Sequence, residues 1–233
     1  MVDIGGSTSD FALCNRTQGN TELLASGGLR LGGTDFDRVL SLADAMPLLG
    51  RGSEIGAEFR SQAPTAPFPR SRQLRKIAFF YDADLLREGR RWIRLARDPA
   101  LFERLAEVLE SHLGHDIAYA VEAAKIDANR APTGNIALGM IERGFSAEIT
   151  QTAMETTLAA DADAIGREAL ATLDHAGIKP GSVDQVVYIG GSSLMGVIRT
   201  TLTRALPDAR QEDAAIFTAV VHGLVIAAGR PNA

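Results

Sequence analysis

Alternating apolar and polar residues, interrupted by glycines, fill the first thirty positions of the chain. Side chains of a strand point alternately to opposite faces, so this pattern over residues 3–31 predicts a meander of antiparallel strands. From Gly33 to Ala45 the apolar residues recur at helical spacing, and Thr34 is a suitable N-cap, which predicts a helix. The pattern breaks down between Met46 and Arg72, where Pro, Gly and Ser predict a surface loop.

Helical spacing predominates over residues 73–130, with a break at Asp98-Pro99, because proline suits the first turn of a new helix. Gly114 is expected to end or kink the second of these helices. The remaining predicted elements are a strand over 134–142, a helical run capped by Ser146, a long helix over 157–176 closed by Gly177, a buried strand over 183–189 and two helices over 194–205 and 212–228.

A glycine-rich turn follows the first predicted strand. Asp3 lies at the end of that strand, Gly5 and Gly6 follow, and Ser7 and Thr8 complete the turn. Glycine lacks a Cβ and tolerates positive φ, so successive backbone N–H groups can converge on an anion, to which the two hydroxyls add donors. This composition favours a phosphate-binding loop in which Asp3 faces a metal-bound water. An ordinary hairpin turn has the same composition and stays the alternative.

Three further segments accompany this turn in a fixed order. They are Leu31-Gly32-Gly33-Thr34-Asp35-Phe36-Asp37, Val121-Glu122-Ala123-Ala124-Lys125-Ile126 and Val186-Val187-Tyr188-Ile189-Gly190-Gly191-Ser192-Ser193. Together the four segments resemble the second phosphate loop, the Leu-Gly-Gly segment, the ribose-binding helix and the adenosine loop of DnaK-type heat-shock protein 70 ATPases. That family belongs to the actin, sugar kinase and heat-shock protein 70 superfamily. The chain most resembles its YegD-like branch, which lacks a peptide-binding domain.

The resemblance implies an α/β fold: one ribonuclease H-like lobe of an actin-like ATPase, with a mixed sheet flanked by helices and an inserted α/β cap subdomain. The nucleotide-binding subdomain would comprise residues 1–31 and 158–233, and the cap residues 32–157. Members of the family clamp nucleotide between two lobes, and the first lobe's Asp-x-Gly-Thr-Thr loop and catalytic lysine have no match here. We therefore expect this chain to be the second lobe, with Met1 supplied as a start codon.

The resemblance also implies roles for individual residues. The aspartate matching Asp3 orients magnesium-bound water, the threonine matching Thr8 hydrogen-bonds the terminal phosphate, and Asp10 matches a second carboxylate of the metal shell, so these three are the candidate catalytic residues. Such groups suffice because phosphoryl transfer needs mainly positioning and charge neutralisation. The positions implied to hold phosphates are Gly5, Gly6, Ser7, Gly32 and Gly33; Ser7 stands where the family usually has a third glycine.

A second set of residues is implied to hold the nucleoside. Glu122 and Lys125 share one helical face and would hold the ribose hydroxyls, although a solvated ion pair is the ordinary fate of such a pair. Asn129 matches a position that contacts the adenine edge. Ile126 and Leu194 replace the two cations that sandwich adenine in the family, which predicts weaker or less selective base binding; packing of the two as core is the alternative. The adenosine loop comprises Gly190, Gly191 and Ser192.

Composition narrows the function classes. The formal net charge of −5 argues against a dedicated nucleic-acid binder, which normally carries a basic stripe. The single cysteine excludes an internal disulfide and favours a reducing cytoplasm. We find no apolar run long enough to span a membrane and no secretory leader, so no membrane partner is expected.

The resemblance therefore predicts the nucleotide-binding half of a molecular chaperone of the heat-shock protein 70 family, which binds ATP or ADP with Mg²⁺ in the intact protein. The isolated lobe is expected not to hydrolyse ATP, since half of the phosphate and metal shell would be missing. Its partners would be the first lobe, nucleotide, and protein clients or co-chaperones. Alternatives are a bacterial actin-like scaffold or filament protein, a sugar or carboxylate kinase, and a nucleotide sensor without turnover.

Overall fold

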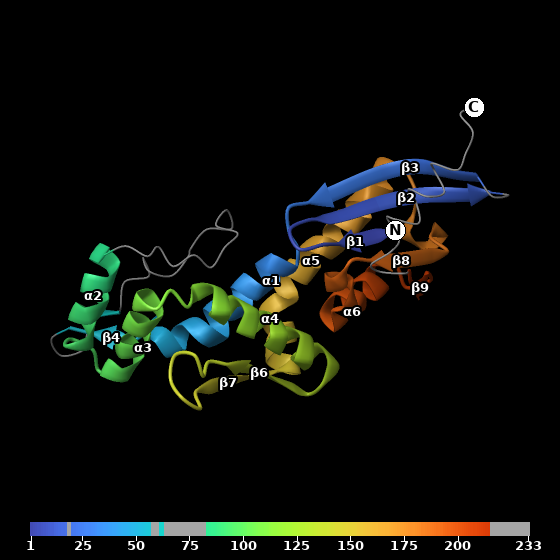
Figure 1. Cartoon of the computed structure of the whole chain (residues 1–233). Helices are drawn as coiled ribbons and strands as arrows, with labels where there is room; N and C mark the ends of the chain where they lie inside the picture. The colour runs from blue at the N-terminus through green and yellow to red at the C-terminus, as the bar shows by residue number, and fades with distance from the viewer. Residues whose placement is uncertain (18–19, 57–60, 63–82, 215–233) are drawn as a thin grey trace, which may run out of the picture. The chain divides into compact units, whose positions relative to one another are not determined.

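The computed structural model describes residues 1–17, 20–56, 61–62 and 83–214 (Figure 1). The chain divides into two compact units, one formed by residues 1–34 and 159–233 and the other by residues 35–158. The sequence-based boundaries, residues 1–31 with 158–233 and residues 32–157, lie within three residues of these. Among the described residues, no helix is both long and apolar enough to cross a membrane.

The first unit contains a five-stranded sheet with the order β3-β2-β1-β8-β9. Its strands are β1 (Val2–Ile4), β2 (Ser9–Thr17), β3 (Asn20–Leu29), β8 (Gln185–Ile189) and β9 (Arg210–Asp213). β1, β2 and β3 form an antiparallel meander, whereas β8 pairs in parallel with both β1 and β9. The sheet is therefore mixed, which confirms the predicted α/β class and the predicted meander.

One face of this sheet is buried because its apolar residues have the period of two that a strand requires. Val2 pairs with Phe11 and with Tyr188, and each of these three side chains is at most 4% exposed. α5 (Gln151–His175) packs against the sheet at Gly27, where an added Cβ would lie 2.3 Å from Thr172 Oγ1.

The other helices of the first unit lie close to the ends of β8. They are the 3₁₀ turns η4 (Pro180–Ser182) and η5 (Gly191–Leu194), and α6 (Gly196–Ala205). α5 ends near Gly177, whose φ of +68° is readily adopted only by glycine, as predicted from the sequence.

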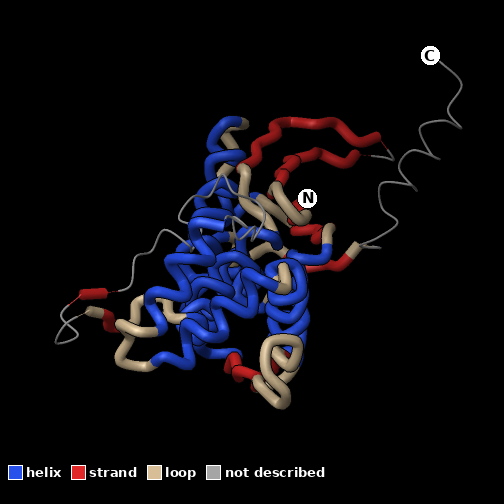
Figure 2. The backbone as a smooth tube through the Cα atoms, turned by 60° about the vertical axis from the view of Figure 1, so that its left-hand side comes forward, coloured by secondary structure: helices blue, strands red, loops and turns tan. Residues whose placement is uncertain are grey.

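The second unit is built mainly of helices (Figure 2). It begins with α1 (Gly33–Leu40), a π-helical turn η1 (Ser41–Ala45), a 3₁₀ turn η2 (Met46–Leu49) and a hairpin of β4 (Glu54–Ile55) and β5 (Ser61–Gln62). The first two residues of α1, Gly33 and Thr34, belong to the first unit, and the second unit begins at Asp35. The predicted loop over 46–72 is thus wrong for its first part, and residues 57–60 and 63–72 lie outside the described ones.

Three helices and a hairpin complete the second unit: α2 (Ala83–Ile93), α3 (Pro99–Glu110), α4 (Gly114–Arg130), β6 (Thr133–Ala137) and β7 (Ser146–Thr150). Asp98 caps α3 by accepting a hydrogen bond from the Ala100 N–H at 3.2 Å, and proline occupies the first turn, as predicted. α4 approaches β6 so closely that a Cβ on Gly134 would lie 2.0 Å from the carbonyl oxygen of Ala124.

Besides the loop over 46–72, several predicted element boundaries are wrong. The helix predicted over 157–176 begins earlier, at Gln151. Gly114 begins α4 rather than ending a helix, and Ser146 begins a strand rather than a helix because residues 146–150 find a pairing partner in β6. The predicted strand over 134–142 ends at Ala137, before a turn that contains Gly144. Residues 212–213 belong to β9, which pairs with β8, whereas the rest of the predicted helix over 212–228 lies outside the described residues.

Candidate functional site

The turn between β1 and β2 is tight. The Gly5 N–H donates to the carbonyl of Thr8 at 3.0 Å and so closes the turn. Within the described part of the chain, the backbone N–H groups of Gly6 and Ser7 have no protein acceptor. A pair of adjacent N–H donors next to two hydroxyl side chains can bind an anion.

Residues 32–34, which include the first two residues of α1, pack directly onto this turn. The Gly33 N–H donates to the carbonyl of Gly5 at 2.9 Å, and the Thr34 N–H donates to the carbonyl of Gly6 at 2.8 Å. A Cβ on Gly32 would lie 2.7 Å from both the Gly5 carbonyl oxygen and the Ser7 nitrogen. Since both of these are backbone atoms, only glycine allows the two segments to come this close.

A third glycine loop, residues 190–194, follows β8 and meets the other two. Gly190 has φ of +81°, and a Cβ there would lie 2.3 Å from the carbonyl oxygen of Ile4 and 2.7 Å from Oδ1 of Asp3. A Cβ on Gly33 would lie 2.4 Å from Oγ of Ser192. Because β1 and β8 are parallel, their carboxyl ends lie at the same edge of the sheet, where ligands commonly bind in α/β folds.

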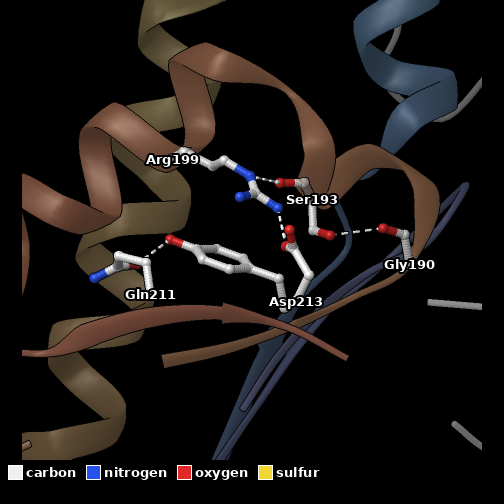
Figure 3. A network of polar contacts seen from close by, with 6 residues as sticks. Gly190, Ser193, Arg199, Gln211 and Asp213 are labelled. Carbon is white, nitrogen blue, oxygen red and sulfur yellow. Dashed lines mark hydrogen bonds and ion pairs between the residues drawn. The ribbon is translucent and has the colours of Figure 1, made fainter. Parts of the chain in front are cut away.

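A network of polar contacts attaches this loop to the sheet (Figure 3). Arg199 on α6 donates from Nε to the carbonyl of Ser193 at 3.3 Å, and its guanidinium forms an ion pair with Asp213. The same guanidinium lies over the ring of Tyr188, 4.7 Å from its centroid. The hydroxyl of Ser193 in turn donates to the carbonyl of Gly190 at 2.7 Å.

Tyr188 lies at the base of this network and is fully buried. Its hydroxyl donates to Oε1 of Gln211 at 2.5 Å, which links β8 to β9. Burial raises the pKa of Tyr188 to about 12, although the nearby Arg199 acts in the opposite direction. The hydroxyl therefore remains protonated, and so remains a donor, at neutral pH.

Two carboxylates face each other at the same edge of the sheet. Asp3 on β1 and Asp10 on β2 are directly paired, so their side chains lie on the same face. Burial raises the pKa of Asp3, and the negative charge of Asp10 raises it further. A carboxylate pair of this kind fits a cation, and its oxygen ligands are those that Mg²⁺ prefers. Within the described ranges no third His, Cys, Asp or Glu joins the pair, so water would have to complete a magnesium shell.

The nucleoside residues predicted on a helix all lie on α4, in the second unit. Glu122 is exposed, Ile126 is 40% exposed and Asn129 is half-buried. Lys125 differs from them because it is buried. Its Nζ lies 2.7 Å from Oδ1 of Asp37 on α1, and the two side chains are 7% and 15% exposed.

Asp37 is the partner that the sequence did not assign to Lys125. Burial raises the pKa of Asp37, the charge and hydrogen bond of Lys125 lower it, and the charge of Glu122 raises it. Lys125 therefore pairs with Asp37 of α1 and does not form the solvated ion pair with Glu122 that was the alternative. Its role toward a ribose stays a prediction.

The structure thus brings together, within the first unit, the residues predicted to bind phosphate and metal and those predicted to form the adenosine site. They are Asp3, Gly5, Gly6, Ser7, Thr8, Asp10, Gly32, Gly33, Gly190, Gly191, Ser192 and Leu194. It places Glu122, Lys125, Ile126 and Asn129 on one helix of the second unit.

Arg199 and Asp213 are the site-supporting residues that sequence reasoning missed. Arg199 lies six residues after the loop residue that it holds. Asp213 belongs to β9, whose last two residues were predicted to begin a helix. All four residues of β9 are polar, so no alternation of apolar and polar residues marks it as a strand. In the comparison of the chain with models of known protein families, no family model matches.

Proposed function

We propose that this chain is the nucleotide-binding second lobe of a heat-shock protein 70-like ATPase with the actin-like, ribonuclease H-like fold, and that it binds ATP or ADP with Mg²⁺. The observation that carries the proposal is the packing of three glycine loops, residues 5–8, 32–33 and 190–192, at the edge of the sheet that holds the carboxylate pair. Gly32 and Gly190 lie so close to backbone atoms of a neighbouring segment that a Cβ would not fit, so the arrangement requires glycine at these two positions.

Each group at this edge has a task in the proposal. The N–H groups of Gly6 and Ser7, which have no acceptor among the described residues, donate to phosphate oxygens together with the hydroxyl of Thr8. Asp3 and Asp10 hold water of the metal shell in place. A bound Mg²⁺ would neutralise the charge of the phosphates.

The exposed face of α4 supplies the nucleoside contacts in this proposal. The carboxylate of Glu122 accepts hydrogen bonds from the ribose hydroxyls, and Ile126 gives the base an aliphatic rather than a cationic neighbour. Lys125 acts by fixing α4 to α1 through Asp37. Base selectivity is therefore expected to be weak, with ADP and GDP bound within about tenfold of each other.

In the intact protein, the partner of this lobe would be a first lobe that completes the phosphate and metal shell. The proposal assigns ATP hydrolysis and the role of a cytoplasmic chaperone to that two-lobed protein. The chain described here is expected to bind nucleotide without turning it over.

Calorimetric titration of the chain with Mg²⁺-ADP tests the proposal. We expect saturable binding that is weakened at least tenfold both by Glu122→Ala and by removing Mg²⁺ with EDTA. Glu103→Ala, which removes an exposed glutamate of α3, is the matched control and is expected to bind like the wild type. No saturable binding at millimolar ADP, or equal affinities for the two Glu→Ala variants, would contradict it.

A further inference from the structure

Two serine hydroxyls next to the glycine loops are used inside the protein. Ser9 donates from its hydroxyl to the carbonyl of Leu31 at 2.8 Å, and Ser193 donates to the carbonyl of Gly190 at 2.7 Å. Both serines are fully buried, with 0% of each residue exposed. These two hydroxyls therefore hold the loops in place and are not accessible to a ligand.

Four other hydroxyls on the same three loops are accessible. Thr34 is exposed, and Ser7, Thr8 and Ser192 are partly exposed. Among the described residues, none of these four side chains forms a hydrogen bond. All four belong to the first unit, so they lie on one compact body. Each hydroxyl can therefore donate either to water or to a ligand.

The hydroxyl of Thr34 lies beside the turn that follows β1. A Cβ on Gly6 would lie 3.6 Å from Oγ1 of Thr34. The Thr34 N–H donates to the carbonyl of Gly6 at 2.8 Å, which fixes the backbone of Thr34 against the turn. The Gly6 N–H itself has no acceptor within the described part of the chain. A hydroxyl donor and an N–H donor without an acceptor thus come from two adjacent loops.

The hydroxyl of Ser192 reaches the same segment from the third loop. A Cβ on Gly33 would lie 2.4 Å from Oγ of Ser192, so this hydroxyl occupies space that a side chain at position 33 would fill. Gly33 directly precedes Thr34, and the hydroxyls of Ser192 and Thr34 therefore flank one short segment. The resemblance assigned Ser192 to the adenosine loop and gave Thr34 no contact with the nucleotide.

We propose that Thr34 and Ser192 bind the second phosphate of a diphosphate group, whose first phosphate accepts from the N–H groups of Gly6 and Ser7. The choice of phosphate as the anion rests on the proposed function, whereas the placement of the two hydroxyls does not. Hydrogen bonds to charged oxygens are stronger than those between neutral groups. The two hydroxyls thereby make the site specific for diphosphates and triphosphates over monophosphates.

The charges around the loops require a cation with this ligand. Residues 5–8, 32–34 and 190–194 contain no lysine or arginine. The carboxylate of Asp3 is close, because its Oδ1 lies 2.7 Å from the position of a Cβ on Gly190. An uncompensated diphosphate would be repelled by this carboxylate and by Asp10, which is paired with it. The ligand is therefore the magnesium complex of a diphosphate.

Calorimetric titration of the chain with magnesium pyrophosphate and with magnesium orthophosphate tests the proposal. Thr34→Val and Ser192→Ala should each weaken pyrophosphate binding by about tenfold or more, because each loses a hydrogen bond to a charged oxygen. Orthophosphate lacks the second phosphate, so its affinity should change by less than about threefold. Thermal midpoints within about 2 °C of the wild type would show that the variants are folded.

Two further variants separate the hydroxyl from the shape of the side chain. Thr34→Ser keeps the hydroxyl and should bind pyrophosphate within about threefold of the wild type. Thr200→Val removes the hydroxyl of an exposed threonine on α6 and is the matched control, with wild-type binding of both anions expected. Equal losses in Thr34→Ser and Thr34→Val would show that the hydroxyl is not the cause and would overturn the proposal.

Three other results would also overturn it: no pyrophosphate binding by the wild-type chain at millimolar concentration, wild-type affinity in both Thr34→Val and Ser192→Ala, or equal losses for the two anions. Pyrophosphate carries no nucleoside, so the two proposals fail separately. If ADP binds as expected but these two variants bind pyrophosphate like the wild type, only the present inference is wrong. If pyrophosphate behaves as expected but Glu122→Ala binds ADP like the wild type, only the proposed function is wrong.

Discussion

Removing the charge of Lys125 should destabilise the protein more than removing any exposed cation. In Lys125→Met the carboxylate of Asp37 stays behind, 15% exposed and without the ammonium that lies 2.7 Å away. Breaking a buried pair from one side typically costs about 3–5 kcal/mol, because the remaining charge is desolvated and uncompensated. We therefore expect the free energy of unfolding to fall by about 3 kcal/mol at pH 8.

Urea denaturation followed by circular dichroism measures this loss. With a denaturant slope of about 2 kcal/mol per M, a loss of about 3 kcal/mol lowers the midpoint by about 1.5 M. Arg97→Met is the matched control, since the Arg97 and Glu54 side chains are 71% and 49% exposed. Exposed pairs contribute about 0–1 kcal/mol, so this control should lose no more than that.

The pH dependence of the loss identifies its cause. Burial raises the pKa of Asp37 above its ordinary value of 3.8, and loss of Lys125 removes the main cause that lowers it. A carboxyl whose pKa is higher in the folded state binds its proton more tightly there, so protonation stabilises the fold as pH falls. The loss caused by Lys125→Met should thus be smaller at pH 5 than at pH 8.

A companion variant separates the unpaired charge from the loss of packing. Lys125→Met combined with Asp37→Leu removes both charges, and replacing a buried pair by apolar residues is often neutral or stabilising. This double variant should recover most of the stability at pH 8. A loss no larger than that of Arg97→Met, or one that is equal at pH 5 and pH 8, would refute the reasoning.

Three further predictions concern the loops and the sheet edge. Gly190→Ala should lower the free energy of unfolding by about 1–3 kcal/mol and weaken ADP binding, because the added methyl group would clash with the Ile4 carbonyl. Thermal unfolding measures the first effect and calorimetry the second. Wild-type values in both assays would contradict the clash. Asp3→Asn should weaken the dependence of ADP affinity on Mg²⁺ at least tenfold, and an unchanged magnesium titration would contradict its role. Arg199→Gln should speed amide exchange in residues 191–194, whereas Arg204→Gln on the same helix should not; equal rates would show that the network does not hold the loop.

The sequence determined the parts of the site that depend on local geometry. Glycine is the residue that permits a positive φ or contact between two backbones, and Gly32 and Gly190 occupy positions with such a requirement. The alternation of residues 3–31 specified a meander, because the period of two decides which side chains share a face. These signals act over a few residues, so they are visible without the fold.

Tertiary structure decided the features that depend on partners far away in the chain. Ser146 begins a strand because β6 is there to pair with it, and residues 210–213 form β9 because β8 offers a parallel edge. Lys125 lies on the predicted helix, but its burial and its bond to Asp37 arise from the packing of α4 near α1. Strand pairing and burial are non-local, because their free energy comes from groups that only the folded chain brings together.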